Sequence, residues 1–270
     1  FLAYRNGKPC GRIAAILNRG HIERYHDNRG FFGFFESIDD QEVADGLFEA
    51  ARQWFAQRGI HALRGPCNPS LNYALGLLVD GFDSSPKFMM TYNPPYYERL
   101  IENYGFRKTQ DLYAYWGHID WLPKVAARYG HIADQLVEHH GLKLRPLNPR
   151  RFVEEVKMFL DIYNRSLVNT WGFVPMSDRE VRHLANGLRY LIVPELAIGA
   201  EIEGRPVGAA FALLDYNPRI RQINGRLFPL GFLRLLFGRR RIKGMRVISA
   251  NVIPEFQRLG VGLALLHGLA

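Results

Sequence analysis

The stretch VIPEFQRLGVGLA, residues 252–264, places two glycines between a predicted strand and a predicted helix. The apolar run that leads into it, residues 246–253, predicts a β-strand, and the apolar residues at 263–266 predict a buried helix. Gly260 and Gly262 lie in the turn between them. Glycine lets the backbone approach an anion, and a helix N-terminus presents unpaired N–H groups. The stretch therefore predicts a strand–turn–helix unit that can bind a phosphate or pyrophosphate.

An internal repeat supports a two-copy architecture. Residues 6–18, NGKPCG followed by RIAAILN, match residues 203–215, EGRPVG followed by AAFALLD. Both segments predict a β-hairpin with a tight turn, and the early glycine of the second strand indicates a bulge or a close backbone approach. Two unrelated hairpins could give the same match. The order of the elements around each hairpin therefore decides whether the chain contains two copies of one fold.

The second half has clear signals for helix starts. Asn148 and Pro149 are suited to open an amphipathic helix, and Ser177 with Glu180 forms a capping box that opens another. The predicted order is a strand at 142–147, these two helices, strands at 196–202, 205–214 and 246–253, and a final helix.

The first half begins inside the same series. After its hairpin, Asp39 or Asp40 caps a helix that runs through Trp54, and Gly105 ends a second helix. The predicted elements are strands at 31–37, 61–65 and 112–116, with helices between the first two and at 94–106. We interpret residues 1–120 as one domain, 121–141 as a helical connector and 142–270 as a second domain.

Residues 252–264 closely resemble the acyl-CoA signature of the GNAT superfamily of N-acetyltransferases, a strand followed by Gln/Arg-x-x-Gly-x-Gly/Ala and a helix. Residues 97–106, YERLIENYGF, resemble the late Tyr-Glu-x-x-Gly-Phe helix of that family. The resemblance implies an α+β (α/β) protein with two tandem GNAT-like domains, each a mixed, mostly antiparallel sheet flanked by helices. Both copies would be truncated at the chain ends.

The first copy departs from the signature. Its turn, residues 37–43, has no glycine and places Asp39, Asp40 and Glu42 at the helix start. Carboxylates suit the helix dipole there but would repel a pyrophosphate. We therefore expect a degenerate first copy that lacks the CoA loop.

The resemblance implies an acyl-CoA-dependent N-acyltransferase, with acetyl-CoA or another acyl-CoA as co-substrate and a small-molecule or amino-acid-like primary amine as acceptor. In such a site the amine attacks the thioester directly. The N–H of Val252 is the candidate donor to the carbonyl oxygen, unless it pairs within the sheet as in an ordinary strand. The residues implied to bind the acyl-CoA are Val252, Ile253, Gln257, Arg258, Leu259, Gly260, Val261 and Gly262.

Two loops contain candidates for the acceptor site. Asn169, Trp171 and Phe173 lie between the two helices of the second copy, where a buried tryptophan could equally pin a loop. The connection from residue 65 to residue 97 is unusually long, which is typical of functional loops. Its candidates are Asn68, Asn72, Tyr92 and Asn93, each also suited to a turn or a cap.

The positive charge is concentrated in one segment. The chain has a formal net charge of +9, and residues 219–246 contain Arg and Lys but no acid. Within it, residues 226–246 combine large apolar residues with a cation cluster, as an element that touches a membrane surface would. The segment could instead bind phosphates of CoA or RNA, or form a helical arm packed on the other copy. We expect no specific nucleic-acid partner.

The cysteines, the histidines and the apolar segments indicate which kinds of site and location to expect. Only Cys10 and Cys67 are present, without metal-ligand spacing, and the neighbours His139 and His140 point about 100° apart on a helix, so we expect no metal site. We expect a cytoplasmic protein, since neither a signal peptide nor an apolar membrane span is visible. Two alternatives stay open: a Fem-like transferase that uses aminoacyl-tRNA, and a non-catalytic acyl-CoA sensor.

Overall fold

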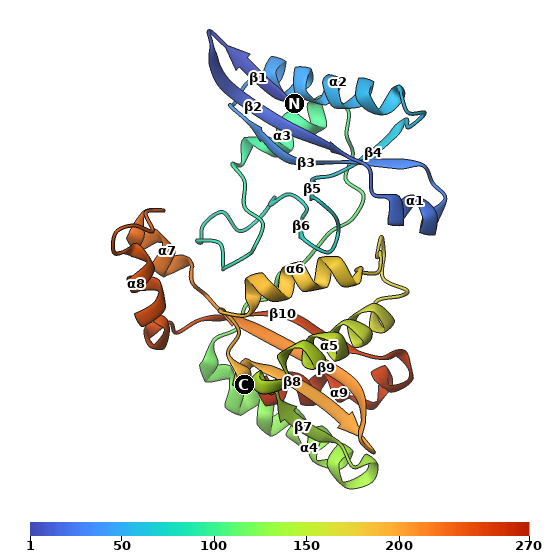
Figure 1. The fold of residues 1–270 in the computed structure, drawn as a ribbon, viewed down its shortest axis with the longest axis vertical. Helices are drawn as coiled ribbons and strands as arrows, with labels where there is room; N and C mark the ends of the chain where they lie inside the picture. Colours follow the sequence, from blue (N-terminus) through green and yellow to red (C-terminus); the bar gives the residue numbers. More distant parts are fainter. Residues whose placement is uncertain (270) are drawn as a thin grey trace. The chain divides into compact units, whose positions relative to one another are not determined.

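The computed structural model describes residues 1–269 and divides into two compact units (Figure 1). The first unit contains Phe1–Ala114 together with Trp171–Val174, and the second contains Tyr115–Thr170 and the residues from Pro175 onward. Each unit has its own sheet flanked by helices, so the predicted α+β class is confirmed. The predicted connector is α4 (Leu122–His140), which ends at Gly141 in a left-handed conformation and belongs to the second unit.

The first unit is built on a four-stranded sheet in the order β1-β2-β3-β4. β1, β2 and β3 are antiparallel, and β4 is parallel to β3. The elements are β1 (Leu2–Arg5), β2 (Lys8–Ile16), α1 (Arg19–Tyr25), β3 (Arg29–Ser37), α2 (Gln41–Ala56), β4 (Ala62–Arg64), β5 (Cys67–Asn68), β6 (Ala74–Leu75) and α3 (Tyr96–Asn103).

The helix α2 covers this sheet because its apolar residues recur at helical spacing. Asp40 caps its N-terminus by accepting a hydrogen bond from the N–H of Val43. Its buried residues Leu47, Phe48 and Ala51 pack with Phe32 and other sheet residues in one core. The hairpin, the strand after it and both predicted helices of this half are thus confirmed.

One predicted strand of the first half is wrong. Residues 112–116 have no regular secondary structure, and Tyr113, Tyr115 and Trp116 are 77%, 93% and 65% exposed. The segment alternates in a strand-like way, but no strand of the described residues pairs with it, and a strand needs a hydrogen-bonded neighbour.

The second unit follows the predicted order, with one insertion. Its elements are η1 (Ile119–Trp121), α4, β7 (Lys143–Pro146), η2 (Pro149–Arg151), α5 (Phe152–Ser166), α6 (Asp178–Leu188), η3 (Pro194–Leu196), β8 (Ala197–Ile202), β9 (Arg205–Leu214), α7 (Asn217–Ile223), α8 (Gly231–Phe237), η4 (Arg239–Arg241), β10 (Met245–Val252), η5 (Pro254–Leu259) and α9 (Val261–Leu269). The capping box of Ser177 and Glu180 is present. The basic segment forms α7, α8 and η4, between β9 and β10.

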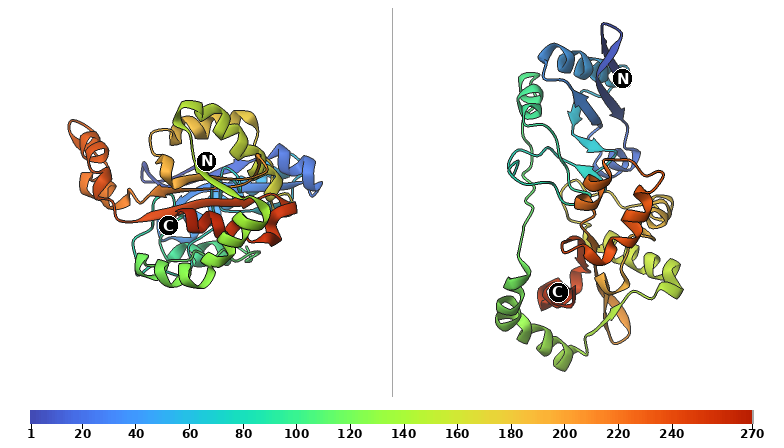
Figure 2. Two further views of the ribbon diagram at one scale, coloured as in Figure 1. Left: turned by 90° about the horizontal axis from the view of Figure 1, so that it is seen from below. Right: turned by 90° about the vertical axis from the view of Figure 1, so that its left-hand side faces the viewer.

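Helices cover both faces of the second sheet, whose antiparallel strands follow the order β10-β9-β8-β7. α5 and α6 lie on one face, and α4 and α9 lie on the other (Figure 2). Val261, Ala264 and Leu265 of α9 are fully buried in the core with Val207 and Ala209 of β9. None of the helices in the described residues combines the length and the apolar character needed to cross a membrane.

The internal repeat is present in three dimensions. Both hairpin turns pair a left-handed polar residue with a left-handed glycine, Asn6-Gly7 (φ 52° and 73°) and Glu203-Gly204 (φ 51° and 75°). The first strand of each hairpin has a register shift at the same place, after Ala3 in one and after Ala200 in the other. Equivalent turns and equivalent bulges are a stronger match than the sequence alone gives.

The early glycine in the second strand of each hairpin, Gly11 or Gly208, lies close to a helix and to a neighbouring strand. A Cβ on Gly11 would lie 2.8 Å from Leu47 Cδ1 of α2 and 2.9 Å from the carbonyl oxygen of Glu36. A Cβ on Gly208 would lie 3.0 Å from Leu265 Cδ1 of α9 and 3.1 Å from the carbonyl oxygen of Asn251. α2 and α9 therefore approach their sheets in the same way, and Leu47 and Leu265 are equivalent.

Gly11→Ala should destabilise the first unit by about 1–3 kcal/mol, because the new methyl group would overlap a leucine and a backbone oxygen. Gly46→Ala is the matched control: Gly46 lies in α2 with nothing within 4 Å of an added Cβ. It should stabilise by about 0.5–1 kcal/mol. Urea unfolding of both variants measures the difference, and equal effects would contradict the close approach at Gly11.

Candidate functional site

The predicted phosphate-binding turn joins β10 to α9. η5 leads into Gly260, which has φ 94° and ends the turn in the left-handed region that favours glycine. The N–H groups of Leu263 and Ala264 donate to the carbonyl of Gly260, so hydrogen bonding of the helix starts there. The amides of Gly260, Val261 and Gly262 precede these donors, in the positions that a helix leaves unpaired. The turn thus presents successive N–H groups at the positive end of α9.

The N–H of Val252 points away from the sheet. Ile253 donates to the carbonyl of Val207 in β9 at 2.9 Å, and Val252 is opposite Gly208. Residue pairs of antiparallel strands alternate between hydrogen-bonded and non-hydrogen-bonded pairs. Val252 and Gly208 are therefore a non-hydrogen-bonded pair. Its carbonyl accepts instead from Gln257 Nε2 at 2.9 Å. β10 is the edge strand in the described part of the sheet, so the N–H of Val252 faces an open edge.

A polar network behind β10 fixes the turn. Gln257 Nε2 donates to the carbonyl of Ser166 at 3.3 Å as well as to Val252, so this side chain connects α5 to the turn. Ser166 Oγ donates to Asn251 Oδ1 at 3.1 Å, and Asn251 Nδ2 donates to Ser249 Oγ. Gln257 therefore shapes the turn from within the unit, and its predicted contact with an acyl-CoA stays a prediction. Asn251 and Ser166 were not among the predicted residues, although an asparagine within a mostly apolar strand is itself a signal.

The surface of the turn is cationic. Arg165 and Arg205 both bind Glu255, at 3.2 and 3.4 Å. The backbone amide of Glu255 first, and then these two charges, lower the pKa of its carboxyl. Arg258 is exposed and has no ion pair with another described residue. Arg165 also pairs with Asp161 at 3.3 Å, so Arg165, Arg205 and Arg258 are offset by two carboxylates, and one positive charge is left for an anion.

The equivalent position of the first unit is closed by its own side chains. Ile38 donates to the carbonyl of Cys10, as Ile253 does to Val207, so Ser37 corresponds to Val252. The N–H of Ser37 donates to Tyr97 Oη at 3.1 Å, and Tyr96 Oη donates to the carbonyl of Ser37 at 2.9 Å. Both edge-facing groups of the strand are therefore satisfied within the unit.

The turn of the first unit is also shorter and acidic. Six positions separate Ser37 from the buried Val43 of α2, whereas nine separate Val252 from Val261 of α9. Asp40 occupies the N-terminus of α2, and the hydrogen bond from Arg5 at 2.6 Å lowers the pKa of its carboxyl. An anionic side chain thus already fills the place where a phosphate would bind.

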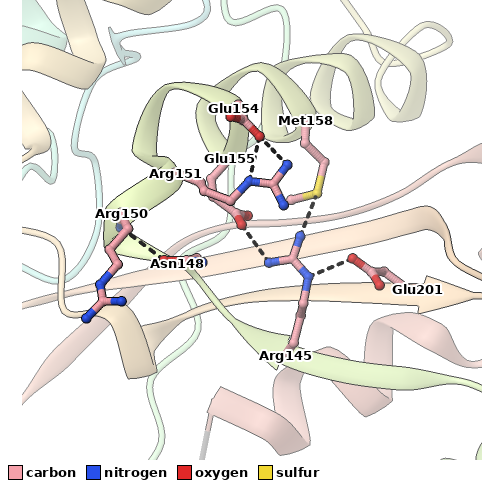
Figure 3. A network of polar contacts seen from close by, with 8 residues as sticks. All are labelled: Arg145, Asn148, Arg150, Arg151, Glu154, Glu155, Met158 and Glu201. Carbon is pink, nitrogen blue, oxygen red and sulfur yellow. Dashed lines mark hydrogen bonds and ion pairs between the residues drawn. The ribbon is translucent and has the colours of Figure 1, made fainter.

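A second network holds α5 on the sheet (Figure 3). Arg145 of β7 donates to Glu155 of α5 at 2.7 Å and to Glu201 of β8 at 2.6 Å, and it contacts Met158 Sδ at 3.6 Å. The hydrogen bond to Glu155 is the main reason that the pKa of Arg145 is raised. Glu155 is 7% exposed, so this ion pair fixes the helix that carries Ser166.

The acceptor candidates fall into two groups. Phe173 is 4% exposed and Trp171 lies under Arg64, with 4.6 Å from the guanidinium carbon to the ring centroid. Asn72 Nδ2 donates to the carbonyl of Val174, so the long loop of the first unit meets the segment 171–174. Asn169 is exposed and belongs to the second unit.

The remaining loop candidates brace the backbone. Asn68 Oδ1 accepts from the N–H of Phe34 at 2.5 Å. The buried Asn93 side chain accepts from the N–H of Leu78 and donates to its carbonyl, which closes the loop between them. Tyr92 is 55% exposed. Asn68 therefore ties the loop to β3, and Asn93 ties the loop to itself.

Sequence analysis also missed a buried histidine–carboxylate pair. His21 is 1% exposed, and its Nε2 lies 3.0 Å from Asp27 Oδ1. Its ring packs between Tyr25 and Phe31, and its Nδ1 has no hydrogen-bond partner in the described residues. The enclosed ring offers no surface to a substrate.

Two proteins align with nearly the whole chain. Protein YghO of Escherichia coli K12 is 32% identical over 273 residues, which cover 98% of this chain and 68% of that protein. Bacterial ceramide synthase of Caulobacter vibrioides is 34% identical over 268 residues, which cover 95% of this chain and 67% of that protein. No family model matches the sequence.

Arg145→Met should destabilise the second unit by about 2 kcal/mol, because it leaves the buried Glu155 carboxylate without its cation. Arg151→Met is the matched control, since its pair with Glu154 is exposed on the same helix and should change stability by less than about 1 kcal/mol. Thermal unfolding compares the two. A similar loss of stability in both variants would mean that the buried ion pair of Glu155 stabilises the unit no more than the exposed pair of Glu154.

Proposed function

This chain belongs to the family of bacterial ceramide synthase and YghO, and on that premise we propose that it is an N-acyltransferase that uses an acyl-CoA donor. A ceramide is the amide of a fatty acid with a long-chain amino alcohol. The name of that relative therefore supports acyl transfer to a primary amine, the reaction that the resemblance to GNAT proteins also implies. It favours a long-chain acyl group over acetyl and a lipid amine over an amino-acid-like acceptor.

One observation carries the proposal, the open turn between β10 and α9. Gly260 to Gly262 combine the amides that an α-helix leaves without a carbonyl partner, a left-handed glycine and nearby cations, which together suit a diphosphate. In the proposed complex these amides bind the pyrophosphate of CoA and Arg258 pairs with one of its phosphates. The shorter, acidic turn of the first unit takes no part.

The chemistry needs one further group, and Val252 supplies it. The amine nitrogen attacks the thioester carbonyl carbon, so that a C–N bond forms and the C–S bond breaks. The proton that the amine loses balances the one that the departing thiolate takes up. Negative charge develops on the carbonyl oxygen, and the edge-facing N–H of Val252 donates to it.

Kinship with the GNAT superfamily is part of this proposal. The repeated hairpin, the equivalent bulges and the equivalent helices α2 and α9 support two copies of one fold. In this interpretation the first copy has lost its ligand, because Tyr96 and Tyr97 fill the position that the acyl group would take beside Ser37.

Gly260→Ala should weaken acyl-CoA binding about tenfold, since a left-handed conformation costs other residues about 1–2 kcal/mol and the turn would rearrange. Gly204→Ala is the matched control: Gly204 has φ 75° with open space around it and lies in a hairpin turn. It should lose similar stability and keep its affinity. Calorimetric titration with CoA measures both, and an unchanged affinity in Gly260→Ala would contradict the proposed donor site.

The activity itself is tested with purified chain, palmitoyl-CoA or acetyl-CoA, and a panel of amines that includes a long-chain amino alcohol. We expect an amide product by mass spectrometry, with palmitoyl-CoA preferred. At 100 times its Kd, the donor should also add about 2.7 kcal/mol to the stability of the chain. Donor binding without any amide product would contradict the transferase and favour a sensor. The absence of both donor binding and amide product would exclude CoA as the donor.

A further inference from the structure

The basic arm, residues 217–244, joins β9 to β10 and has an unusual surface. It contains α7, α8 and η4, and it extends away from the sheet of its unit (Figure 2). Its sequence has eight Arg and Lys residues and no Asp or Glu. The base of the arm is anchored, because Arg239 Nη2 donates to the carbonyl of Ile192 at 2.8 Å.

Large apolar side chains of the arm face solvent. Phe228 and Phe237 are each 80% exposed, and Leu230 is 61% exposed. Leu227 and Phe232 are also exposed, and the rings of Phe228 and Phe232 lie 5.8 Å apart. Exposing one such residue is ordinary, but five within eleven positions form a patch that water solvates poorly.

The cations beside this patch are not neutralised. Arg219 donates to the neutral Gln222, and Arg239 donates to a carbonyl. Among the described residues no carboxylate forms an ion pair with Arg226, Arg234 or Arg240. The arm therefore keeps its positive charge next to its apolar residues.

We propose that the basic arm binds the surface of an anionic lipid bilayer. Phenylalanine and leucine would enter the boundary between headgroups and acyl chains, and the arginines would pair with anionic headgroups. Both parts of the surface fit this partner, whereas RNA would use the cations and leave the apolar patch in water. The inference stands apart from acyl transfer, although a bilayer would also present a lipid amine to the same unit.

The test is co-sedimentation of the whole chain with vesicles of phosphatidylcholine alone or with 30% phosphatidylglycerol. We expect binding to the anionic vesicles only, weakened at high salt. Phe228→Ser/Phe237→Ser should weaken it about tenfold or more, since two exposed rings lose their burial. Arg234→Glu/Arg240→Glu should do the same through charge.

Matched controls separate the arm from the rest of the surface. Tyr190→Ser removes a ring that is 78% exposed elsewhere on the unit, and Arg179→Glu/Arg182→Glu reverses two exposed cations of α6. Neither should change vesicle binding by more than about twofold. Circular dichroism confirms that each variant is folded, and Phe237→Ser alone replaces the double variant if it is not.

Three results would overturn the proposal. The first is no binding to anionic vesicles at any salt concentration. The second is equal loss of binding in the control variants. The third is binding that needs the arginines but not the phenylalanines, with a single-stranded RNA competing for it, because that pattern would identify the arm as a polyanion site. Since acyl transfer from soluble donors is measured separately, failure here leaves the proposed activity untouched.

Discussion

Three backbone amides precede the first N–H groups that bond within α9, and an α-helix offers them no carbonyl partner. Gly260 makes this geometry possible, since its φ of 94° turns the chain out of η5 and into the helix. Contacts from the rest of the second unit hold that turn in position. Leu265 and Val261 seat α9 on the sheet, Gln257 ties the turn to α5, and an ion pair of the buried Glu155 holds α5 in place.

The two units show how one arrangement can be open or closed. Ser37 and Val252 occupy equivalent strand positions, each opposite the equivalent glycine of its hairpin, and each turns its N–H away from that hairpin. In the first unit two tyrosines satisfy that edge, and Asp40 fills the helix N-terminus. In the second unit the described residues leave the same N–H facing an open edge. A polar group that the described residues leave without a partner is suited to a ligand.

The helix caps, the hairpins and the strand–turn–helix unit could be predicted from the sequence, because residues close together in the chain determine them. Asp40, Ser177 and the turn glycines act within a few residues, so the caps, hairpins and the strand–turn–helix unit follow from pattern. The strand expected at 112–116 was wrong because pairing depends on a distant neighbour that no local pattern reveals. The roles of Asn251, Ser166 and Tyr97 depend on contacts across the sheet, so they became visible only in the fold.

We propose that the amides of Gly260 to Gly262 hold the diphosphate of an acyl-CoA while Val252 faces its thioester. A crystal structure of the chain with a non-hydrolysable acyl-CoA analogue would show both contacts. We predict phosphate oxygens within about 3 Å of these amides, the hydrogen-bond distance for N–H to oxygen, and the acyl carbonyl beside β10. A diphosphate bound elsewhere, with the amides of the turn paired to protein carbonyls, would contradict it.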